Sequence, residues 1–214
     1  MPACDKLISM RVCCVQNADE IRRPCPDVIV FPEYSELSEL IEAQSKCTDS
    51  IVVGAVVEED RISGKLENRG RGVLLHHGLN QIDYLKIETD SSGTTGVHKR
   101  PESLPVYEFD DVCIGVLICV DLVKADFGGF GRDVIQQVRS SRATFKIVCV
   151  PAAMTSIWNW SEPLESNYRG VYIVLCNNHT KSYQPRCNSF IAGPDGKKII
   201  EEPNASWPIS ASFT

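Results

Sequence analysis

The sequence predicts an α/β protein built as a sandwich of sheets and helices. Short apolar runs typical of strands recur along the chain, helical patterns lie between some of them, and other runs are joined directly by hairpins. A doubly wound parallel sheet would need a long crossover after each strand, so this mixture of connections favours a sandwich. No Pro/Ser-rich linker and no internal repeat divides the 214 residues, and we therefore expect one domain over residues 1–214.

Ten segments have the β-branched and apolar composition of strands. In chain order they are residues 10–16, 27–33, 50–58, 71–78, 82–88, 105–109, 113–121, 145–151, 171–177 and 189–200. Two turn signals divide them: HHGLN at 76–80 predicts a hairpin, and PDG at 194–196 predicts a tight turn, since glycine accepts the positive φ angles that such turns need.

Two segments have the spacing of amphipathic helices. SELSELIEAQSK at 35–46 begins with Ser35, a residue type that caps helix N-termini. The apolar face of this helix comprises Leu37, Leu40 and Ile41. RDVIQQVRSS at 132–141 shows the same spacing, so we expect two helices that each bury one face on a sheet.

The composition argues against nucleic acid and membranes as partners. Acidic residues outnumber basic ones by 28 to 22, and the net charge of −6 provides no overall basic field. The longest apolar runs, such as VIVF at 28–31, are far too short to span a bilayer. The first ten residues, MPACDKLISM, carry charges and lack a long apolar core, so we expect no signal peptide and a cytoplasmic location.

The ten cysteines call for an explanation, and a metal site is not the one that their spacing favours. No CxxC pair occurs, and the four histidines do not complete a zinc-binding pattern. Several cysteines lie inside apolar strand-like runs, where a free thiol behaves as a small buried side chain. These are Cys13, Cys14, Cys113, Cys149 and Cys176.

Three strand-like segments carry a polar residue at their ends that burial does not explain. DVIVFPE ends in Glu33, IDYLKIE carries Lys86, and GVLICVD carries Cys119. A thiol needs a base to become a nucleophile, and the tetrahedral intermediate of acyl transfer needs a cation or donor for its oxygen. Carboxylate, ammonium and thiol together suffice for cysteine-based acyl transfer, although each residue alone is more often solvated or part of a core.

The order of these motifs resembles the nitrilase, or carbon–nitrogen hydrolase, superfamily. FPEYS at 31–35 is similar to the motif of the family's catalytic glutamate, and GVLICVD at 115–121 to its nucleophile motif. The segment from Asn68 to the Y-x-K at 84–86 is similar to its lysine motif, and PES at 101–103 lies where the family has a second glutamate. The similarity extends over about residues 10–200 in the family's order.

This resemblance implies an α-β-β-α sandwich with two facing sheets, helices outside and the site at the strand ends. Cys119 would be the nucleophile, Glu33 the general base, and Lys86 the oxyanion-stabilising group, with Glu102 positioning Lys86 or assisting proton transfer. Lys99 is a rival for Lys86, because HKRPE also puts a lysine shortly before Glu102. No metal or organic cofactor is needed, and members commonly pair into dimers.

The same resemblance implies that the chain is shorter than most members of the superfamily. Only NADEIRRPCP at 17–26 stands where members usually have a full helix, and the connection from Glu102 to Cys119 is tight. We expect hydrolysis of a non-peptide C–N bond, in an amide or N-carbamoyl group of a small polar substrate. The Cys-Val-Asp sequence at 119–121 favours amide over nitrile, since nitrile-cleaving members typically show C-W-E. The alternative is a degenerate, non-catalytic binding or assembly module.

Overall fold

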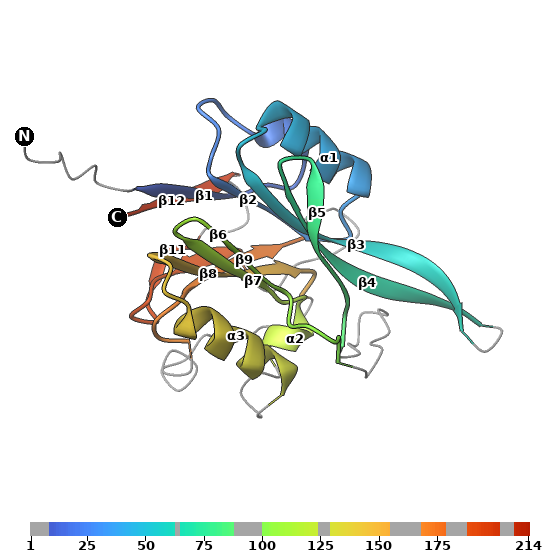
Figure 1. Ribbon diagram of the computed structural model, residues 1–214. Helices are drawn as coiled ribbons and strands as arrows, with labels where there is room; N and C mark the ends of the chain where they lie inside the picture. Colours follow the sequence, from blue (N-terminus) through green and yellow to red (C-terminus); the bar gives the residue numbers. More distant parts are fainter. Residues whose placement is uncertain are drawn as a thin grey trace, which may run out of the picture.

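The computed structural model describes residues 9–62, 65–87, 100–123, 129–154, 168–178, 188–201 and 208–214. Two six-stranded sheets lie face to face, with helix α1 (Leu37–Lys46) on the outer side of one sheet and helix α3 (Phe130–Ser140) on the outer side of the other (Figure 1). This is the α-β-β-α sandwich expected from the sequence.

The first sheet is built from both ends of the chain, in the order β12-β1-β2-β3-β4-β5. Its strands are β1 (Met10–Cys14), β2 (Val28–Glu33), β3 (Ile51–Ile62), β4 (Lys65–His76), β5 (Leu79–Leu85) and β12 (Ile209–Phe213). Strands β1, β2 and β3 are parallel, the adjacent strands β12 and β4 run antiparallel to them, and β5 is antiparallel to β4. The paired strands β3 and β4 extend beyond the body of the molecule as a long hairpin (Figure 1).

The second sheet repeats this arrangement in the order β6-β7-β8-β9-β10-β11. Its strands are β6 (Val106–Phe109), β7 (Val112–Val116), β8 (Phe145–Ala152), β9 (Tyr172–Asn177), β10 (Phe190–Ala192) and β11 (Lys198–Glu201). Again three parallel strands, β7, β8 and β9, are flanked by antiparallel ones. The carboxyl ends of parallel strands are where α/β folds carry their polar sites, so each sheet offers such an edge.

The main core lies between the sheets. Alternate residues of β1 show this, because Val12 and Cys14 belong to the inter-sheet cluster whereas Cys13 belongs to a second cluster under α1. Strands β2 and β8 are buried almost throughout, which fits their continuous apolar sequences.

Each helix approaches its sheet closely at a glycine. A Cβ on Gly54 of β3 would lie 2.8 Å from the Leu40 side chain of α1, and one on Gly115 of β7 would lie 2.8 Å from Val134 of α3. Gly115 interrupts the apolar run of β7 because α3 occupies the space of its side chain. In α1 only Leu40 of the predicted apolar face is buried, whereas Leu37 and Ile41 are 41% and 52% exposed.

Several sequence-based predictions of the elements were wrong. The strand predicted over 50–58 extends to Ile62, and the one predicted over 71–78 begins at Lys65. The strand predicted over 113–121 ends at Val116, and a short helix α2 (Val120–Val123) follows Cys119. Strand β12 was not predicted at all. Ser35 is not the N-cap of α1: Glu36 stands at that position, and the Ser35 hydroxyl donates to the Pro32 carbonyl at 2.8 Å.

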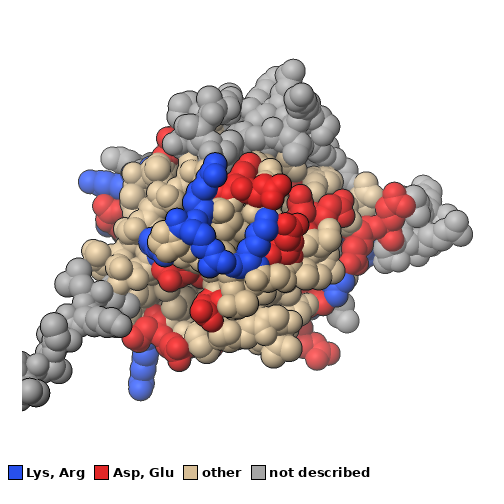
Figure 2. All heavy atoms as spheres, turned by 90° about the horizontal axis from the view of Figure 1, so that it is seen from above, with Lys and Arg blue, Asp and Glu red and all other residues tan. Residues whose placement is uncertain are grey.

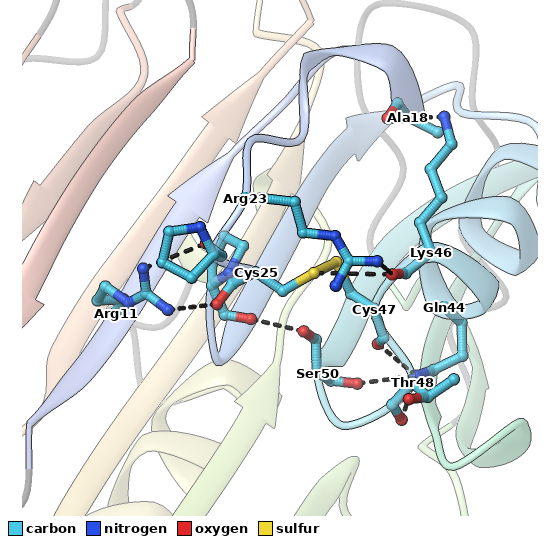
Figure 3. The surroundings of a disulfide bond; sticks show 11 residues. Arg11, Ala18, Arg23, Cys25, Gln44, Lys46, Cys47, Thr48 and Ser50 are labelled. Atoms are coloured by element: carbon cyan, nitrogen blue, oxygen red, sulfur yellow. Dashed lines mark hydrogen bonds between the residues drawn. A yellow bond between two sulfur atoms is a disulfide. The ribbon is translucent and has the colours of Figure 1, made fainter.

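A disulfide between Cys25 and Cys47 joins the segment after β1 to the end of α1 (Figure 3). The other cysteines whose positions the structure describes are buried thiols: Cys13, Cys14, Cys113, Cys119, Cys149 and Cys176. The sequence pattern did not reveal this pairing, because the two cysteines are 22 residues apart and belong to no spacing motif. Across the described part of the chain, no helix has the length and apolar character to cross a membrane.

Candidate active site

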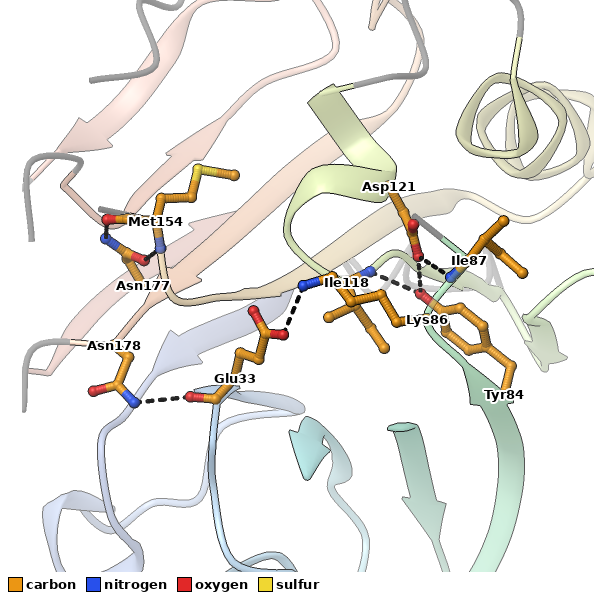
Figure 4. Close-up of polar contacts among 9 residues, drawn as sticks. All are labelled: Glu33, Tyr84, Lys86, Ile87, Ile118, Asp121, Met154, Asn177 and Asn178. Carbon is orange, nitrogen blue, oxygen red and sulfur yellow. Dashed lines mark hydrogen bonds and ion pairs between the residues drawn. The ribbon is translucent and has the colours of Figure 1, made fainter. Parts of the chain in front are cut away.

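A buried ion pair joins the ends of two strands of the first sheet. The Lys86 ammonium, just after β5, donates to Glu33 Oε1 at 2.8 Å, and both side chains have 0% exposure (Figure 4). Placing two charges in a low-dielectric interior is costly, and their attraction offsets that cost only at close range. Two of the three polar strand-end residues predicted from the sequence therefore lie in direct contact.

The backbone turns sharply after Glu33. Pro32 lies next to it within β2. Tyr34 adopts a positive φ of 71°, a backbone angle that residues other than glycine rarely adopt. The Ser35 N–H returns to the Ala55 carbonyl of the adjacent strand at 3.2 Å. Such turns persist where surrounding contacts fix them, and here the turn holds Glu33 at the very end of the strand.

Cys119 stands in a comparable strained turn. Its φ is 47°, and it connects the end of β7 to α2. The Cys119 N–H donates to Pro151 of β8 at 2.9 Å, and the N–H groups of Asp121 and Leu122 donate to Ile118 and Cys119. In this turn, the Val120 N–H makes no hydrogen bond to any of the described residues.

Tyr84 connects the lysine strand to the cysteine turn. Its hydroxyl accepts a hydrogen bond from the Ile118 N–H at 2.7 Å and donates to Asp121 at 3.4 Å (Figure 4). The Ile87 N–H also donates to Asp121. Because residues 84–87 bind residues on both sides of Cys119, the thiol turn is fixed beside Lys86. Burial, followed by the nearby Asp121 carboxylate, raises the pKa of Tyr84 well above its usual value and keeps the hydroxyl protonated.

Two asparagines at the end of β9 hold the opposite side of the site. The Asn178 side chain donates to the Glu33 carbonyl at 2.8 Å, and Asn177 accepts from the Met154 N–H at 2.7 Å (Figure 4). Both asparagines are buried. They link the carboxyl ends of β8 and β9 to that of β2, so the site lies where the edges of the two sheets meet.

Glu102 is not brought into this group. Its side chain is exposed and lines a surface cavity together with Arg69 and Arg100. Lys99, the rival for Lys86, lies outside the described residues.

Sequence reasoning missed Tyr84, Asn177 and Asn178 as parts of this site. Tyr84 belongs to the Y-x-K motif quoted above. Its position two residues before Lys86 could have indicated that it lies near the site. A buried strand that ends in two adjacent amides was a second signal, because such groups must find hydrogen-bond partners.

Several other buried cysteines are thiols of the core. Burial raises the pKa of Cys13 to about 12 and raises that of Cys149 further. Burial and the neighbouring Cys176 raise the pKa of Cys14. These thiols stay protonated at neutral pH and behave as core side chains, as the sequence predicted for them. No group of three or more potential metal ligands occurs among the residues with described positions.

Neither the protein-family models nor the curated proteins yield a match to this chain. Solved structures do. Nit3 from Saccharomyces cerevisiae, a member of branch 10 of the nitrilase superfamily, has a TM-score of 0.67 at 17% identity, covering 95% of this chain and 89% of Nit3.

An amidase of the nitrilase superfamily from Nesterenkonia AN1 is also similar. A variant of it has a TM-score of 0.65 at 13% identity, over 95% of this chain and 90% of the amidase. A second variant, with a TM-score of 0.63 at 12% identity and the same coverages, carries the acetamide moiety of fluoroacetamide covalently added at the active-site cysteine. Similarity at such low identity establishes the fold. The reaction has to be argued from the side chains of this chain. The chain has the fold of the nitrilase, or carbon–nitrogen hydrolase, superfamily.

Proposed function

We propose that this protein hydrolyses a non-peptide C–N bond, in an amide or an N-carbamoyl group, through a cysteine thioester. The observation that carries the proposal is the fully buried Glu33–Lys86 pair, held beside the turn that bears Cys119. A buried ion pair contributes little to stability, so its occurrence next to a strained thiol turn supports a chemical role.

In the first half of the reaction, Glu33 takes the proton of Cys119 and the sulfur attacks the carbonyl carbon. The electron pair of the C=O bond moves to oxygen, where the Lys86 ammonium and the Val120 N–H stabilise the negative charge. Glu33 then gives its proton to the nitrogen, the C–N bond breaks, and the amine or ammonia leaves. Cys119 is left as a thioester.

In the second half, Glu33 takes a proton from water and the hydroxide attacks the thioester carbonyl. The tetrahedral intermediate collapses with cleavage of the C–S bond, and the proton returns to the sulfur. The product is a carboxylic or carbamic acid. Lys86 serves both halves, because the same oxygen becomes negative each time; one oxyanion donor is typically worth on the order of 10²–10³ in rate.

Glu102 is the fourth residue of the proposal, either positioning Lys86 or assisting proton transfer. Its side chain is exposed, so this role needs its own test. The Glu102→Gln variant should reduce turnover while leaving the labelling of Cys119 intact. Unchanged turnover in this variant would remove Glu102 from the machinery.

The proposed substrate is small and polar, and amide is favoured over nitrile. Cys119 is followed by Val120 and Asp121, and Asp121 is bound by Tyr84 and by the Ile87 N–H as a structural support. Covalent addition at the cysteine of the similar Nesterenkonia amidase supports a nucleophilic thiol in this fold.

The decisive experiment combines substrate screening with thiol mapping. Ammonia release is measured over a panel of primary amides, N-carbamoyl amines and ω-amides, for the wild type, Cys119→Ala and the matched control Cys113→Ala. We expect release from one class of substrate, lost in Cys119→Ala and kept in Cys113→Ala. In parallel, iodoacetamide followed by peptide mass mapping should modify Cys119 first at neutral pH. No release across the panel, together with slow and uniform labelling, would favour the non-catalytic module.

Two further expectations from the sequence belong to the proposal. We propose a homodimer, which sedimentation velocity tests directly. We also propose the cytoplasm as the location, and the six buried free thiols support a reducing compartment. The Cys25–Cys47 disulfide would then be reduced in the cell, so alkylation during rapid lysis should find both thiols open to modification.

A further inference from the structure

A cavity of about 240 Å³ lies at the outer face of the first sheet, away from the Glu33–Lys86 pair. Strands β1 and β12 contribute Arg11, Ser210 and Ser212, and the segment after β1 contributes Arg22 and Arg23. The neighbours of Arg11 and the two serines in sequence, such as Val12 and Ile209, face the inter-sheet core instead. The cavity thus shares no residue with the proposed active site.

The three guanidinium groups of this cavity have no carboxylate partner among the side chains that the structure describes. Arg11 donates to the carbonyls of Pro24, at 3.1 Å, and Cys25, and Arg23 donates to the Lys46 carbonyl at 2.8 Å. Arg22 makes no hydrogen bond or ion pair with a described residue. An arginine has five N–H donors, so most donors of this group stay available.

Lys46 lies on the same face and, unlike the arginines of the cavity, forms ion pairs with carboxylates. It is paired with Asp19 at 3.0 Å and with Glu42 at 2.7 Å. Figure 2 shows the Lys and Arg side chains of this face gathered together, with Asp and Glu side chains beside them. Asp19 and Glu42 therefore neutralise Lys46. The Asp27 carboxylate lies beside Arg11 but accepts from its backbone N–H, at 2.6 Å, and not from its guanidinium.

We propose that this cavity binds a phosphate group. A phosphate carries close to two negative charges and three acceptor oxygens, which matches several guanidinium donors with two serine hydroxyls around them. Arginine recognises such groups by paired N–H donors from a rigid plane. A single carboxylate would leave two of the three guanidinium charges unbalanced, whereas a phosphate leaves about one.

The cavity is pre-organised. The Pro24 carbonyl holds the guanidinium of Arg11, and the Lys46 carbonyl at the end of α1 holds that of Arg23 (Figure 3). Groups that are already ordered lose less conformational freedom on binding, so the ligand gains affinity.

The surroundings favour a small ligand over an acidic protein. The cavity is below the size range of sites for drug-like molecules, and it fits a phosphate with a short organic group. Asp19 and Glu42 lie on the same face, and the whole chain carries a net charge of −6. An extended acidic partner would meet repulsion from these charges, whereas a small anion enters only the basic cavity.

The test is isothermal titration calorimetry at pH 7 and low ionic strength, with inorganic phosphate, glycerol 3-phosphate and acetate as probes. We expect one saturable site for phosphate and much weaker binding of acetate. Arg22→Gln removes an exposed cation that supports no other contact, so it should keep the fold and weaken phosphate binding about tenfold or more. Tighter binding of glycerol 3-phosphate than of phosphate would identify the ligand as a phosphate ester, and the reverse order as the free ion.

Arg142→Gln is the matched control, because Arg142 is exposed on the other side of the sandwich, after α3. It should bind phosphate like the wild type. The proposal is overturned if binding does not saturate, if Arg22→Gln binds like the wild type, or if both variants weaken binding equally. It is also overturned if a poly-glutamate peptide binds more tightly than phosphate, since the site would then serve an acidic partner.

Discussion

Glu33 and Lys86 show how a few residues carry information about function. A lysine and a glutamate with no exposed surface are rare in globular proteins, and their mutual attraction roughly balances the cost of removing them from water. A hydrophobic pair would fill the same space at least as well. The retained charges are therefore understood best through the reaction that they are proposed to perform.

The burial of this pair changes what alanine variants are expected to do. The sequence suggests that Glu33→Ala or Lys86→Ala abolishes turnover with the fold largely intact. Either change would remove this ion pair and leave the other charge buried, which typically costs roughly 3–5 kcal/mol. We therefore predict that Glu33→Ala loses both turnover and stability, measured by urea unfolding.

A double-mutant cycle separates the two effects. Glu33→Gln combined with Lys86→Met removes both charges and should recover most of the stability lost in Lys86→Met alone, without recovering turnover. If Lys86→Met alone were as stable as the wild type, the ion pair would not be the cause of the loss.

Tyr84 is predicted to position the thiol turn. Tyr84→Phe leaves the buried Ile118 N–H without its acceptor, at a cost of about 1–3 kcal/mol. Because this contact adjoins Cys119, the change should also alter the pH profile of iodoacetamide labelling at Cys119. The matched control is Tyr172→Phe, whose hydroxyl makes no hydrogen bond within the described structure. A loss of stability with an unchanged labelling profile would make Tyr84 a purely structural residue.

Site residues that interrupt an apolar run could be predicted from the sequence. Those that are ordinary in a strand could not. Glu33, Lys86 and Cys119 stood out because each interrupts or ends an apolar run. Tyr84 did not, since tyrosine is common in strands and its hydroxyl contact is made with a residue 34 positions away. Such contacts depend on the tertiary fold and leave no local signal.

Among the elements, those with a strongly apolar sequence were predicted, whereas β12 and α2 were not. Strands β2 and β8 are apolar except for Glu33 and Lys146 and lie close to their predicted ranges. Strand β12 has alternating burial, with Ile209 and Phe213 inside, but its five residues, ISASF, carry too few strand-forming side chains to stand out. Helix α2 has only four residues and follows a strained turn, so no helical period could reveal it.

The contact between β4 and β6 is predicted to weaken at acidic pH. His76, the last residue of β4, is buried, and its Nδ1 lies 3.0 Å from the Tyr107 hydroxyl of β6. Burial first, and then the neighbouring His77, lower the pKa of His76, while Asp110 and Asp49 act in the opposite direction. The neutral ring is thus favoured in the folded state.

The sign of the pH effect follows from linkage. A histidine with a lowered folded-state pKa contributes stability that is fully present above its unfolded pKa of about 6.5 and is lost as the pH falls through the folded value. We predict a smaller free energy of unfolding at pH 5 than at pH 7, measured in urea. His76→Gln should flatten this difference, and His77→Gln should retain most of it. Equal slopes in the wild type and His76→Gln would exclude His76 as the source.

In the whole molecule, two similar sheets pack against each other and share one hydrophobic core. Each sheet has three parallel strands flanked by antiparallel ones, and the inter-sheet cluster contains residues of both. The proposed active site has the same dual origin, with Glu33 and Lys86 from one sheet and the Cys119 turn and Asn178 from the other. Correct geometry at the site therefore requires that both sheets fold and dock.

From this arrangement we predict that the chain unfolds as one cooperative unit. Val30 of the first sheet and Val148 of the second are fully buried, Val30 between the sheets and Val148 on the side of α3. Val30→Ala and Val148→Ala should each cost roughly 2 kcal/mol and lower the midpoint of the same single transition by about 4–8 °C. Differential scanning calorimetry checks this, with equal calorimetric and van't Hoff enthalpies as the criterion. Two transitions, each shifted by only one of the variants, would mean that the sheets form separate units, and the single domain expected from the sequence would be wrong.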